Sequence, residues 1–340
     1  MEHKDVSYRG VKVLVTGADG FIGSHLAEAL VKLEADVTVL CLYNSGDHFG
    51  WIDDVPQSVY SNLKAVRGDI RDASFVRRIV EIQDVVFHLA ALIAIPHSYI
   101  APQSYVDTNV LGTLNILETA RDSGVRRVIH TSTSEVYGTA ITLPIDETHP
   151  LHGQSPYSAS KIGADMMAQA FARSFELPVA ILRPFNTFGP RQSERAIIPT
   201  VIRQVLDPSC PVVQVGDIST IRDFTFVYDT VAAFLALGSS DNIAFGQPYN
   251  AGSGKAVSIK ELVDLIFVLT GIEKPIRQDS ARMRPCASEV RALLADSTRL
   301  TAVCGWEPQI DLEEGLARTI AWWRGRLDGG HVRRRAQFVA

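Results

Sequence analysis

Short runs rich in β-branched residues alternate with stretches of helical periodicity along the first half of the chain, and no other feature limits the fold as strongly. They read as near-continuous apolar runs, as expected for strands buried on both faces, and the stretches between them are long enough for crossover helices. This pattern predicts an α/β fold built on a Rossmann-type doubly wound parallel sheet. The runs are VKVLV (11–15), DVTVL (36–40), VVFHL (85–89), RRVIHT (126–131) and PVAILR (178–183).

A glycine-rich turn follows the first of these runs. Residues 16–23 read TGADGFIG and lead into the helical stretch SHLAEALVKL. Glycines let a chain turn tightly and approach a pyrophosphate, whose charge is met by free N–H groups at a helix N-terminus. Between a strand and a helix near the start of an alternating chain, such a turn predicts a dinucleotide site. The residues expected to contact the dinucleotide here are Gly17, Gly20, Phe21, Ile22 and Gly23.

The second predicted strand bears on the choice between NAD and NADP. An acidic residue at its end accepts both ribose hydroxyls of NAD and repels the 2′-phosphate of NADP. Cys41 stands where that acid is expected, and no Arg or Lys follows within several residues to hold a phosphate. The choice of dinucleotide is therefore open. Further cofactor contacts are expected, near the ends of strands, from Cys41, Asn44, Asp69, Ile70, Leu89, Ala90 and Ala91.

The regular alternation of apolar strand-like runs with helical stretches ends after about residue 184. Loops rich in Pro, Gly, Arg and Ser, at 189–196 and 279–289, interrupt shorter elements. We expect a dinucleotide-binding domain over 1–184 and a smaller α/β substrate lobe over 185–328, interlocked with the first. Residues 329–340 are basic and lack periodicity, which predicts a solvated tail. Helices capping the lobe are expected at Ile197–Val205, Thr230–Leu237, Ile259–Leu269 and Leu312–Trp323.

Charge and composition disfavour several classes of partner. The formal net charge of -5 provides no basic field of the kind that binds nucleic acid. The longest apolar run, Val85–Ile95, is broken by His88 and is too short to span a bilayer. The four cysteines are widely separated and show no metal-ligand spacing, so free thiols and no metal are expected. These features predict a cytoplasmic protein with a small-molecule ligand and no membrane partner.

A tyrosine and a lysine lie four residues apart in a predicted helix. Tyr157 and Lys161, in PYSASKIGADMMAQAFA, would project from one helix face. An ammonium beside a phenol favours the phenolate, so the spacing predicts a lowered pKa for Tyr157 and a role as general base.

Polar residues follow the strand predicted at 126–131. Thr133, Ser134 and Glu135 stand where a doubly wound sheet presents side chains to the cofactor crevice. Thr133 can hydrogen-bond a substrate hydroxyl alongside Tyr157. A carboxylate at Glu135 could take a proton from a carbon atom of the substrate.

Together these motifs make the chain resemble the extended short-chain dehydrogenase/reductases that act on nucleotide sugars, over residues 11–325. The resemblance implies a catalytic triad of Thr133, Tyr157 and Lys161, with Glu135 matching the base of 4,6-dehydratases. Ser134 occupies the position of an Asp acid in thymidine-type glucose dehydratases, whereas Thr-Ser-Glu occurs in GDP-mannose 4,6-dehydratases and in UDP-glucuronate decarboxylases. The motifs are TGADGFIGSHL, HLAA, TSTSEVYG, PYSASK, RPFNTFGPRQ, RDFTFVYD and the GW-x-P stretch Gly305–Pro308.

Finer features, such as QSPYSASKIGAD (154–165) and RMRPCASEV (282–290), look most like N-acetylglucosamine 4,6-dehydratases of the legionaminic acid type. The resemblance also implies a homodimer formed through the helices around 101–122 and 157–175. It adds Thr131 and Pro184 to the cofactor contacts. The residues implied to bind the nucleotide or its diphosphate are Asn186, Arg195, Arg222 and Arg284.

The function predicted from these residues is a nucleotide-sugar 4,6-dehydratase acting on GDP- or UDP-N-acetylglucosamine with NAD or NADP. Oxidation at C4 would acidify the C5 hydrogen, water would leave from C5 and C6, and the hydride would return to C6. A UDP-glucuronate decarboxylase and a 4-epimerase are the alternatives, the second of which needs no Glu135. A non-enzymatic dinucleotide sensor is the alternative of a different class, although it would have no use for Thr133, Tyr157 and Lys161.

Overall fold

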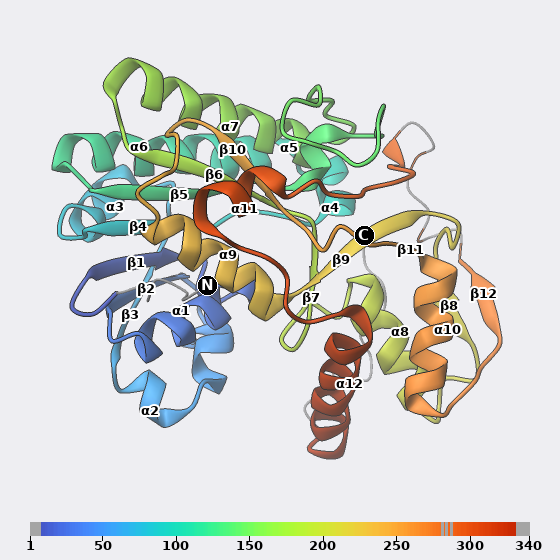
Figure 1. Cartoon of the computed structure of the whole chain (residues 1–340). Coiled ribbons are helices and arrows are strands. Elements are labelled where there is room, and N and C mark those ends of the chain that lie inside the picture. Colours follow the sequence, from blue (N-terminus) through green and yellow to red (C-terminus); the bar gives the residue numbers. More distant parts are fainter. Residues whose placement is uncertain (1–7, 280–281, 283–284, 286–287, 331–340) are drawn as a thin grey trace.

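The protein is built around a seven-stranded parallel sheet, described here from a computed structural model in which residues 8–279, 282, 285 and 288–330 are placed. Its spatial order is β10-β6-β5-β4-β1-β2-β3, and every neighbouring pair runs parallel (Figure 1). The order reverses between β1 and β4, where doubly wound folds bind their ligands. The strands are β1 (Lys12–Thr16), β2 (Asp36–Leu42), β3 (Leu63–Gly68), β4 (Val85–His88), β5 (Arg127–Thr131), β6 (Val179–Pro184) and β10 (Pro248–Ala251).

Helices cover both faces of this sheet, because alternate side chains of each strand point to opposite faces. In β1, Val13 and Val15 join the apolar core under α1 (Phe21–Lys32) and α9 (Val227–Ser239), whereas Leu14 joins the core on the other face. That second face carries α3 (Ala73–Val80), α6 (Gly112–Ser123) and α7 (Pro156–Phe175) (Figure 1). The Rossmann-type α/β fold predicted from the sequence is confirmed.

Smaller sheets form the second part of the molecule. In one, β7 (Asn186–Phe188) and β11 (Ala256–Ser258) flank β9 (Ile221–Phe226), and in the other, β8 (Val213–Val215) pairs with β12 (Ile276–Gln278). The helices α8 (Ile197–Leu206), α10 (Ile259–Thr270) and α12 (Leu312–Asp328) pack on one another beside these sheets (Figure 1). The short remaining elements are η1 (Gly50–Asp54), α2 (Gln57–Tyr60), α4 (Ile95–Ile100), α5 (Pro102–Tyr105), η2 (Val106–Leu111), η3 (Ser134–Tyr137) and α11 (Thr298–Cys304).

One helix packs on both parts of the molecule. The stretch predicted to cap the substrate lobe at 230–237 belongs to α9, which contacts β7 and β9 of the smaller sheet and also α1 and strands β4, β5 and β6 of the large sheet. Val231, Phe234 and Leu237 are buried there, and an apolar face of this width needs the large sheet to cover it.

Neither a membrane helix nor a metal cluster is found in the part of the chain that the structure describes. None of its helices is long and apolar enough to cross a membrane. No group of three His, Cys, Asp or Glu side chains within that part could hold a metal ion. Cys41 is buried, Cys210 and Cys304 are half-buried, and all three are free thiols. Cys286 lies outside the described residues.

Candidate active site

The glycine-rich turn closes against the neighbouring strand β4 at the carboxyl edge of the sheet. Gly17 has φ +70, and a Cβ there would lie 2.7 Å from the backbone nitrogen of Ala90, so only glycine fits. The Thr16 hydroxyl accepts hydrogen bonds from the N–H groups of Leu89 and Ala90, both at 3.1 Å. The turn and the β4 loop therefore form one rigid unit.

Helix α1 begins at this turn without a side-chain cap. Its N-cap is Gly20, no side chain hydrogen-bonds there, and no acidic residue stands in the first turn. The N–H groups of a first helical turn have no partner within the helix, and they attract an anion such as a diphosphate. The residues present therefore fit the diphosphate of a dinucleotide.

The Tyr and Lys pair lies on helix α7, as the spacing predicts. A capping box between Ser155 and Ser158 starts the helix, with proline at its first position. Tyr157 and Lys161 are 7% and 4% exposed. The Lys161 ammonium donates to the Thr131 carbonyl oxygen at 2.6 Å, so α7 is joined to the end of β5.

Residues Thr133, Ser134 and Glu135 lie just after β5 and beside this pair. Thr133 caps the short helix η3, accepting a hydrogen bond from the Glu135 N–H at 3.2 Å. The Thr133 hydroxyl also hydrogen-bonds Tyr157, and the Glu135 carboxylate is close enough to act on the pKa of Tyr157. Ser134 is buried in the same short helix. The structure thus brings together Thr133, Glu135 and Tyr157, with Lys161 one turn further along α7.

Burial controls the titration of this pair. It raises the pKa of Tyr157 above its usual value, against the lowering effect of the Thr133 hydrogen bond, and the Glu135 charge raises it further. Burial lowers the pKa of Lys161 to about 8, opposed by Asp165. The prediction that Lys161 lowers the pKa of Tyr157 is therefore wrong for this structure. The ammonium is directed to the Thr131 carbonyl, and desolvation of the phenol is the larger effect.

A buried carboxylate that the sequence reading missed lies behind Lys161. Asp165 accepts hydrogen bonds from the Ser132 hydroxyl at 2.8 Å and from two nitrogens of Arg183 at 3.2 and 2.9 Å. The His130 Nε2 atom is 3.2 Å from its other oxygen. Burial alone would raise the pKa of Asp165, but His130 and Arg183 hold it below its usual value. Its position four residues after Lys161 is the signal that could have found it.

Two residues predicted to contact the adenosine half of the dinucleotide, Asn44 and Asp69, have hydrogen-bond partners within the chain. Asn44 closes its own loop: its amide nitrogen donates to the Leu42 and His48 carbonyls at 3.2 and 2.9 Å, and its oxygen faces the N–H groups of Gly46 and His48. Asp69 pairs with Arg71 at 2.6 Å. The Thr131 hydroxyl, in contrast, is buried without a hydrogen-bond partner among the described residues, which leaves it available for a ligand.

The predicted substrate contacts lie on several loops and strands. The Asn186 amide donates to the Asp223 carbonyl at 3.2 Å, and Arg222 pairs with Glu289 at 3.2 Å. Arg195 is exposed and acts on the pKa of Tyr105, whose ring centre is 6.3 Å from that of Tyr157. This places the Arg195 charge on the side of the site where Tyr157 lies. Arg284 lies outside the described residues.

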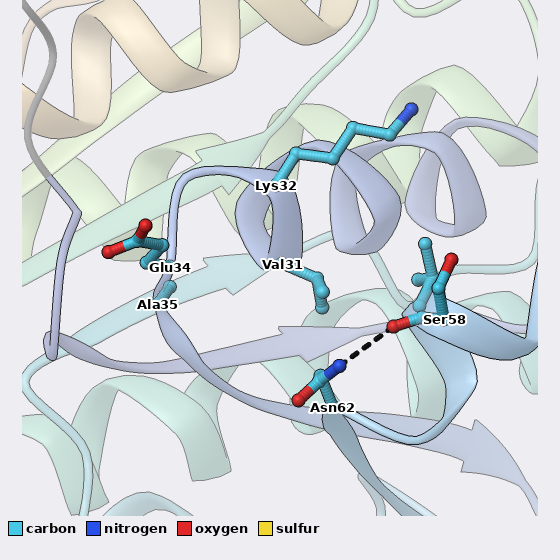
Figure 2. Close-up of a pocket in the computed structure, with 7 residues that line it drawn as sticks. Val31, Lys32, Glu34, Ala35, Ser58 and Asn62 are labelled. Carbon is cyan, nitrogen blue, oxygen red and sulfur yellow. Dashed lines mark hydrogen bonds between the residues drawn. The ribbon is translucent and has the colours of Figure 1, made fainter.

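A separate hollow of about 500 Å³ lies at the opposite edge of the sheet (Figure 2). It is formed where α1 ends and β2 begins, with Asn62 donating to the Ser58 carbonyl at 2.8 Å across one side (Figure 2). Its charged residues have partners outside it, Lys32 with Glu28 and Glu34 with Arg9. It has no part in the site described above. The lining residues are Val31, Lys32, Glu34, Ala35, Ser58, Val59 and Asn62.

Known proteins resemble this chain over nearly its whole length. The UDP-glucose 4-epimerase of Mycolicibacterium smegmatis is 32% identical, over 93% of this chain and 99% of the relative. The dTDP-glucose 4,6-dehydratase of an Actinoplanes species is also 32% identical, over 92% and 98%. The solved structure of a dTDP-glucose 4,6-dehydratase from Streptomyces venezuelae, with NAD bound, superposes with a TM-score of 0.82 at 30% identity, covering 93% of this chain and 98% of that one.

The family assignment follows from a match that spans both parts of the molecule. The model of one family, described as GDP-mannose 4,6 dehydratase, covers residues 14–319, from within β1 to within α12. This range contains the glycine-rich turn, the residues after β5 and the Tyr and Lys pair of α7. With relatives that include both nucleotide-sugar dehydratases and epimerases, the chain belongs to the GDP-mannose 4,6 dehydratase family of extended short-chain dehydrogenase/reductases.

Proposed function

We propose that the protein is a nucleotide-sugar 4,6-dehydratase that uses NAD. The observation that carries this proposal is the position of Glu135, whose N–H donates to the Thr133 hydroxyl and whose carboxylate is near enough to Tyr157 to act on its pKa. Oxidation and reduction at C4 need only the two hydroxyls and a dinucleotide, whereas elimination needs a further base that reaches C5. NAD is bound in the solved dehydratase from Streptomyces venezuelae, and the uncapped start of α1 fits its diphosphate.

The residues act in sequence on one sugar ring. When bound, NAD supplies the acceptor for the C4 hydride and later its donor. Thr133 and Tyr157 hold the C4 hydroxyl. The positive charge of a bound oxidised nicotinamide would favour the Tyr157 phenolate, which burial alone disfavours, and this phenolate would take the hydroxyl proton. Glu135 then removes the C5 proton, which the 4-ketone has acidified. The C6 hydroxyl leaves as water, with a proton from Glu135 or Ser134. The product would be a 4-keto-6-deoxy sugar, in which C5 has regained a proton from solvent and C6 carries the hydrogen that C4 lost.

Lys161 fixes the geometry of the reacting groups. Its bond to the Thr131 carbonyl holds α7 against the end of β5, so that Tyr157 and Thr133 face the same hydroxyl. Its ammonium is also available to the ribose of the nicotinamide half of NAD. Orientation of this kind supplies a large share of the rate in enzymes that rely on a cofactor for the redox step.

The proposed substrate is GDP- or UDP-N-acetylglucosamine. Arginine suits phosphate oxygens because its donors form a fork. Arg195 and Arg222, with Asn186 and Arg284, are the proposed contacts to the nucleotide diphosphate. The lobe 185–328 would supply these contacts and the domain 1–184 the dinucleotide site. We also propose that the protein works as a homodimer in the cytoplasm.

Mass spectrometry of the nucleotide sugar tests this proposal. The full chain is incubated with UDP- and GDP-N-acetylglucosamine in the presence of NAD. We expect a loss of about 18 mass units, the mass of one water, and at least a hundredfold slower loss in Glu135→Gln, in the range expected when a general base is removed. The control is solvent exchange in D₂O, since elimination places deuterium at C5.

A 4-epimerase is the second candidate function, because the relative from Mycolicibacterium smegmatis is named as one. An unchanged mass with inversion at C4, at the same rate in Glu135→Gln, would replace the dehydratase proposal by the epimerase. Loss of CO₂ from UDP-glucuronate would point instead to a decarboxylase.

A further inference from the structure

The end of β2 lacks the acid that would bind the adenosine ribose, but a carboxylate from another element lies beside it. Cys41 is fully buried at that position. The glycine-rich turn is hydrogen-bonded to the same end of the strand, because the N–H groups of Gly17 and Ala18 donate to the Leu40 carbonyl at 3.0 and 3.2 Å. Asp19, the next residue of the turn, is near enough to Cys41 for its charge and its N–H group to act on the thiol.

Contacts from the loop after β2 fix the backbone of Asp19. The Trp51 N–H donates to the Asp19 carbonyl at 3.1 Å. Gly50 has φ +61, and a Cβ there would lie 2.6 Å from that carbonyl oxygen and 2.8 Å from the Asp19 Cβ. Only glycine allows this close approach. The Asp19 side chain therefore starts from a backbone that is held by β2 on one side and by η1 on the other.

The Asp19 carboxylate keeps the capacity to accept hydrogen bonds from a ligand. No side chain among the described residues hydrogen-bonds or ion-pairs with it. Burial raises its pKa, while the N–H groups of Asp19 itself and of Leu42, and the nearby His48, favour the charged form. Asn44 is another polar residue predicted to contact the dinucleotide, and its amide already closes the loop 42–48.

The terminal nitrogens of the nearest arginine, Arg67, are engaged within the chain, while its Nε atom is buried without a hydrogen-bond partner among the described residues. Arg67 stands beside Cys41 in the register of β2 and β3. Its guanidinium pairs with the Asp47 carboxylate, donates to the Asp47 carbonyl at 3.1 Å and stacks on the Phe49 ring at 4.2 Å. The charge of Asp53 also acts on Cys41, but its carboxylate accepts a hydrogen bond from the Phe49 N–H at 2.8 Å. The Asp19 carboxylate, which belongs to the turn itself, is therefore the better placed of the two to meet a ribose.

We propose that Asp19 is the specificity-determining residue that binds the adenosine ribose hydroxyls of the dinucleotide and excludes a 2′-phosphate. This inference rests on the proposed use of a dinucleotide. A carboxylate accepts hydrogen bonds from both ribose hydroxyls and repels a phosphate dianion at the same place. The acid that selects NAD comes from the turn after β1, and β2 contributes an uncharged thiol.

Equilibrium dialysis of the full chain against mixtures of NAD and NADP tests the proposal directly. The bound dinucleotides are released by denaturation and quantified by chromatography, which gives the ratio of the two Kd values. We expect the wild-type protein to prefer NAD by about tenfold or more, as one charge-assisted hydrogen bond allows. Asp19→Asn should reduce this preference by about tenfold. Asp19→Ser should reduce it by the same factor, which would show that the effect comes from loss of the carboxylate and not from the new amide group. Circular dichroism confirms that each variant is folded.

A matched control separates the local effect from a change in net charge. Asp36 is the exposed first residue of β2, at the far end of the strand, so Asp36→Asn removes one charge and should leave the ratio unchanged. Preference for NADP in the wild-type protein, or a ratio in both Asp19 variants that is unchanged from the wild type, overturns the proposal. If the wild-type protein binds neither dinucleotide, the proposed function fails instead.

Discussion

At the scale of single residues, the ammonium of Lys161 is a charge that folding places out of water. Its folded pKa of about 8 is below the usual value of 10.5, so the unfolded chain binds the proton more tightly. Burial of this lysine therefore costs stability at all pH values below about 8. The cost falls as the pH rises from about 8 towards 10.5, where both states lose the proton.

Lys161→Met is expected to stabilise the protein while it removes activity. The free energy of unfolding at pH 7 should rise by about 1 to 3 kcal/mol, since each pKa unit is worth about 1.4 kcal/mol and the Thr131 carbonyl loses its donor. The gain should shrink at pH 9.5. Urea denaturation of both proteins at the two pH values measures this. A variant less stable than the wild type at pH 7 contradicts the interpretation.

The residues of the site divide into those that spacing reveals and those that only tertiary structure reveals. Tyr157 and Lys161 follow from a spacing of four in a helix, and Thr133 and Glu135 follow from their place after a strand. Asp19 and Cys41 come from different elements, and their proximity depends on the hydrogen bonds from the turn to Leu40. The direction of the Tyr157 pKa shift depends on burial, which local sequence does not specify.

At the scale of elements, Asp165 joins helix α7 to strands β5 and β6. Its partners Ser132 and Arg183 lie at the ends of those strands, and Lys161, one turn earlier on α7, binds β5. Loss of the carboxylate from a buried network of this kind leaves the Arg183 charge without a partner. The geometry of the catalytic residues after β5 therefore relies on this carboxylate.

Asp165→Asn is expected to lower the free energy of unfolding by about 3 to 5 kcal/mol, since the Arg183 guanidinium would stay buried without its counter-charge. Ser132→Ala is the matched control: it removes one neutral donor to the same carboxylate and should cost only about 1 kcal/mol. Denaturant titration at pH 7 measures both. Equal losses in the two variants would show that the charge of Asp165 has no special role.

The sequence predicts the five central strands well and the remaining two poorly. The strands β1, β2, β4, β5 and β6 are long apolar runs. Strand β3 is a half-buried edge strand with Lys64 and Arg67, and β10 is only four residues long, with a proline and an asparagine. Neither has the continuous apolar pattern of a central strand. The π-helical turn η2 has no sequence pattern of its own, although the buried Asn109 there clamps Leu92 to α7 through Ser160.

At the scale of the whole molecule, apolar side chains remain exposed on η2 and α7. Val106 and Leu111 are each 48% exposed and Met166 is 42% exposed, and the two elements pack side by side. They lie in the helices through which the family resemblance implies a dimer. An exposed apolar face of this kind is typical of a surface that another protein covers.

Leu111→Arg is expected to convert a homodimer into a monomer, because an unpaired charge would be placed within the apolar face. Light scattering coupled to size-exclusion chromatography measures the mass. Val268→Arg is the control, since Val268 is 77% exposed on α10, in the other part of the molecule. A monomeric wild-type protein, or a dimer that survives Leu111→Arg, would remove these helices as the interface.

Strand β10 comes much later in the chain than the strand it pairs with, and this order has consequences for synthesis and for evolution. This strand pairs with β6, but more than sixty residues, which include most of the first smaller sheet and helix α9, separate the two in the chain. While a ribosome makes the lobe, β6 is an open edge with unpaired backbone groups, the kind of edge that recruits other chains. For the same reason, a substrate lobe cannot be exchanged between relatives by one cut after β6, because the graft must also bring the strand that closes the recipient's sheet.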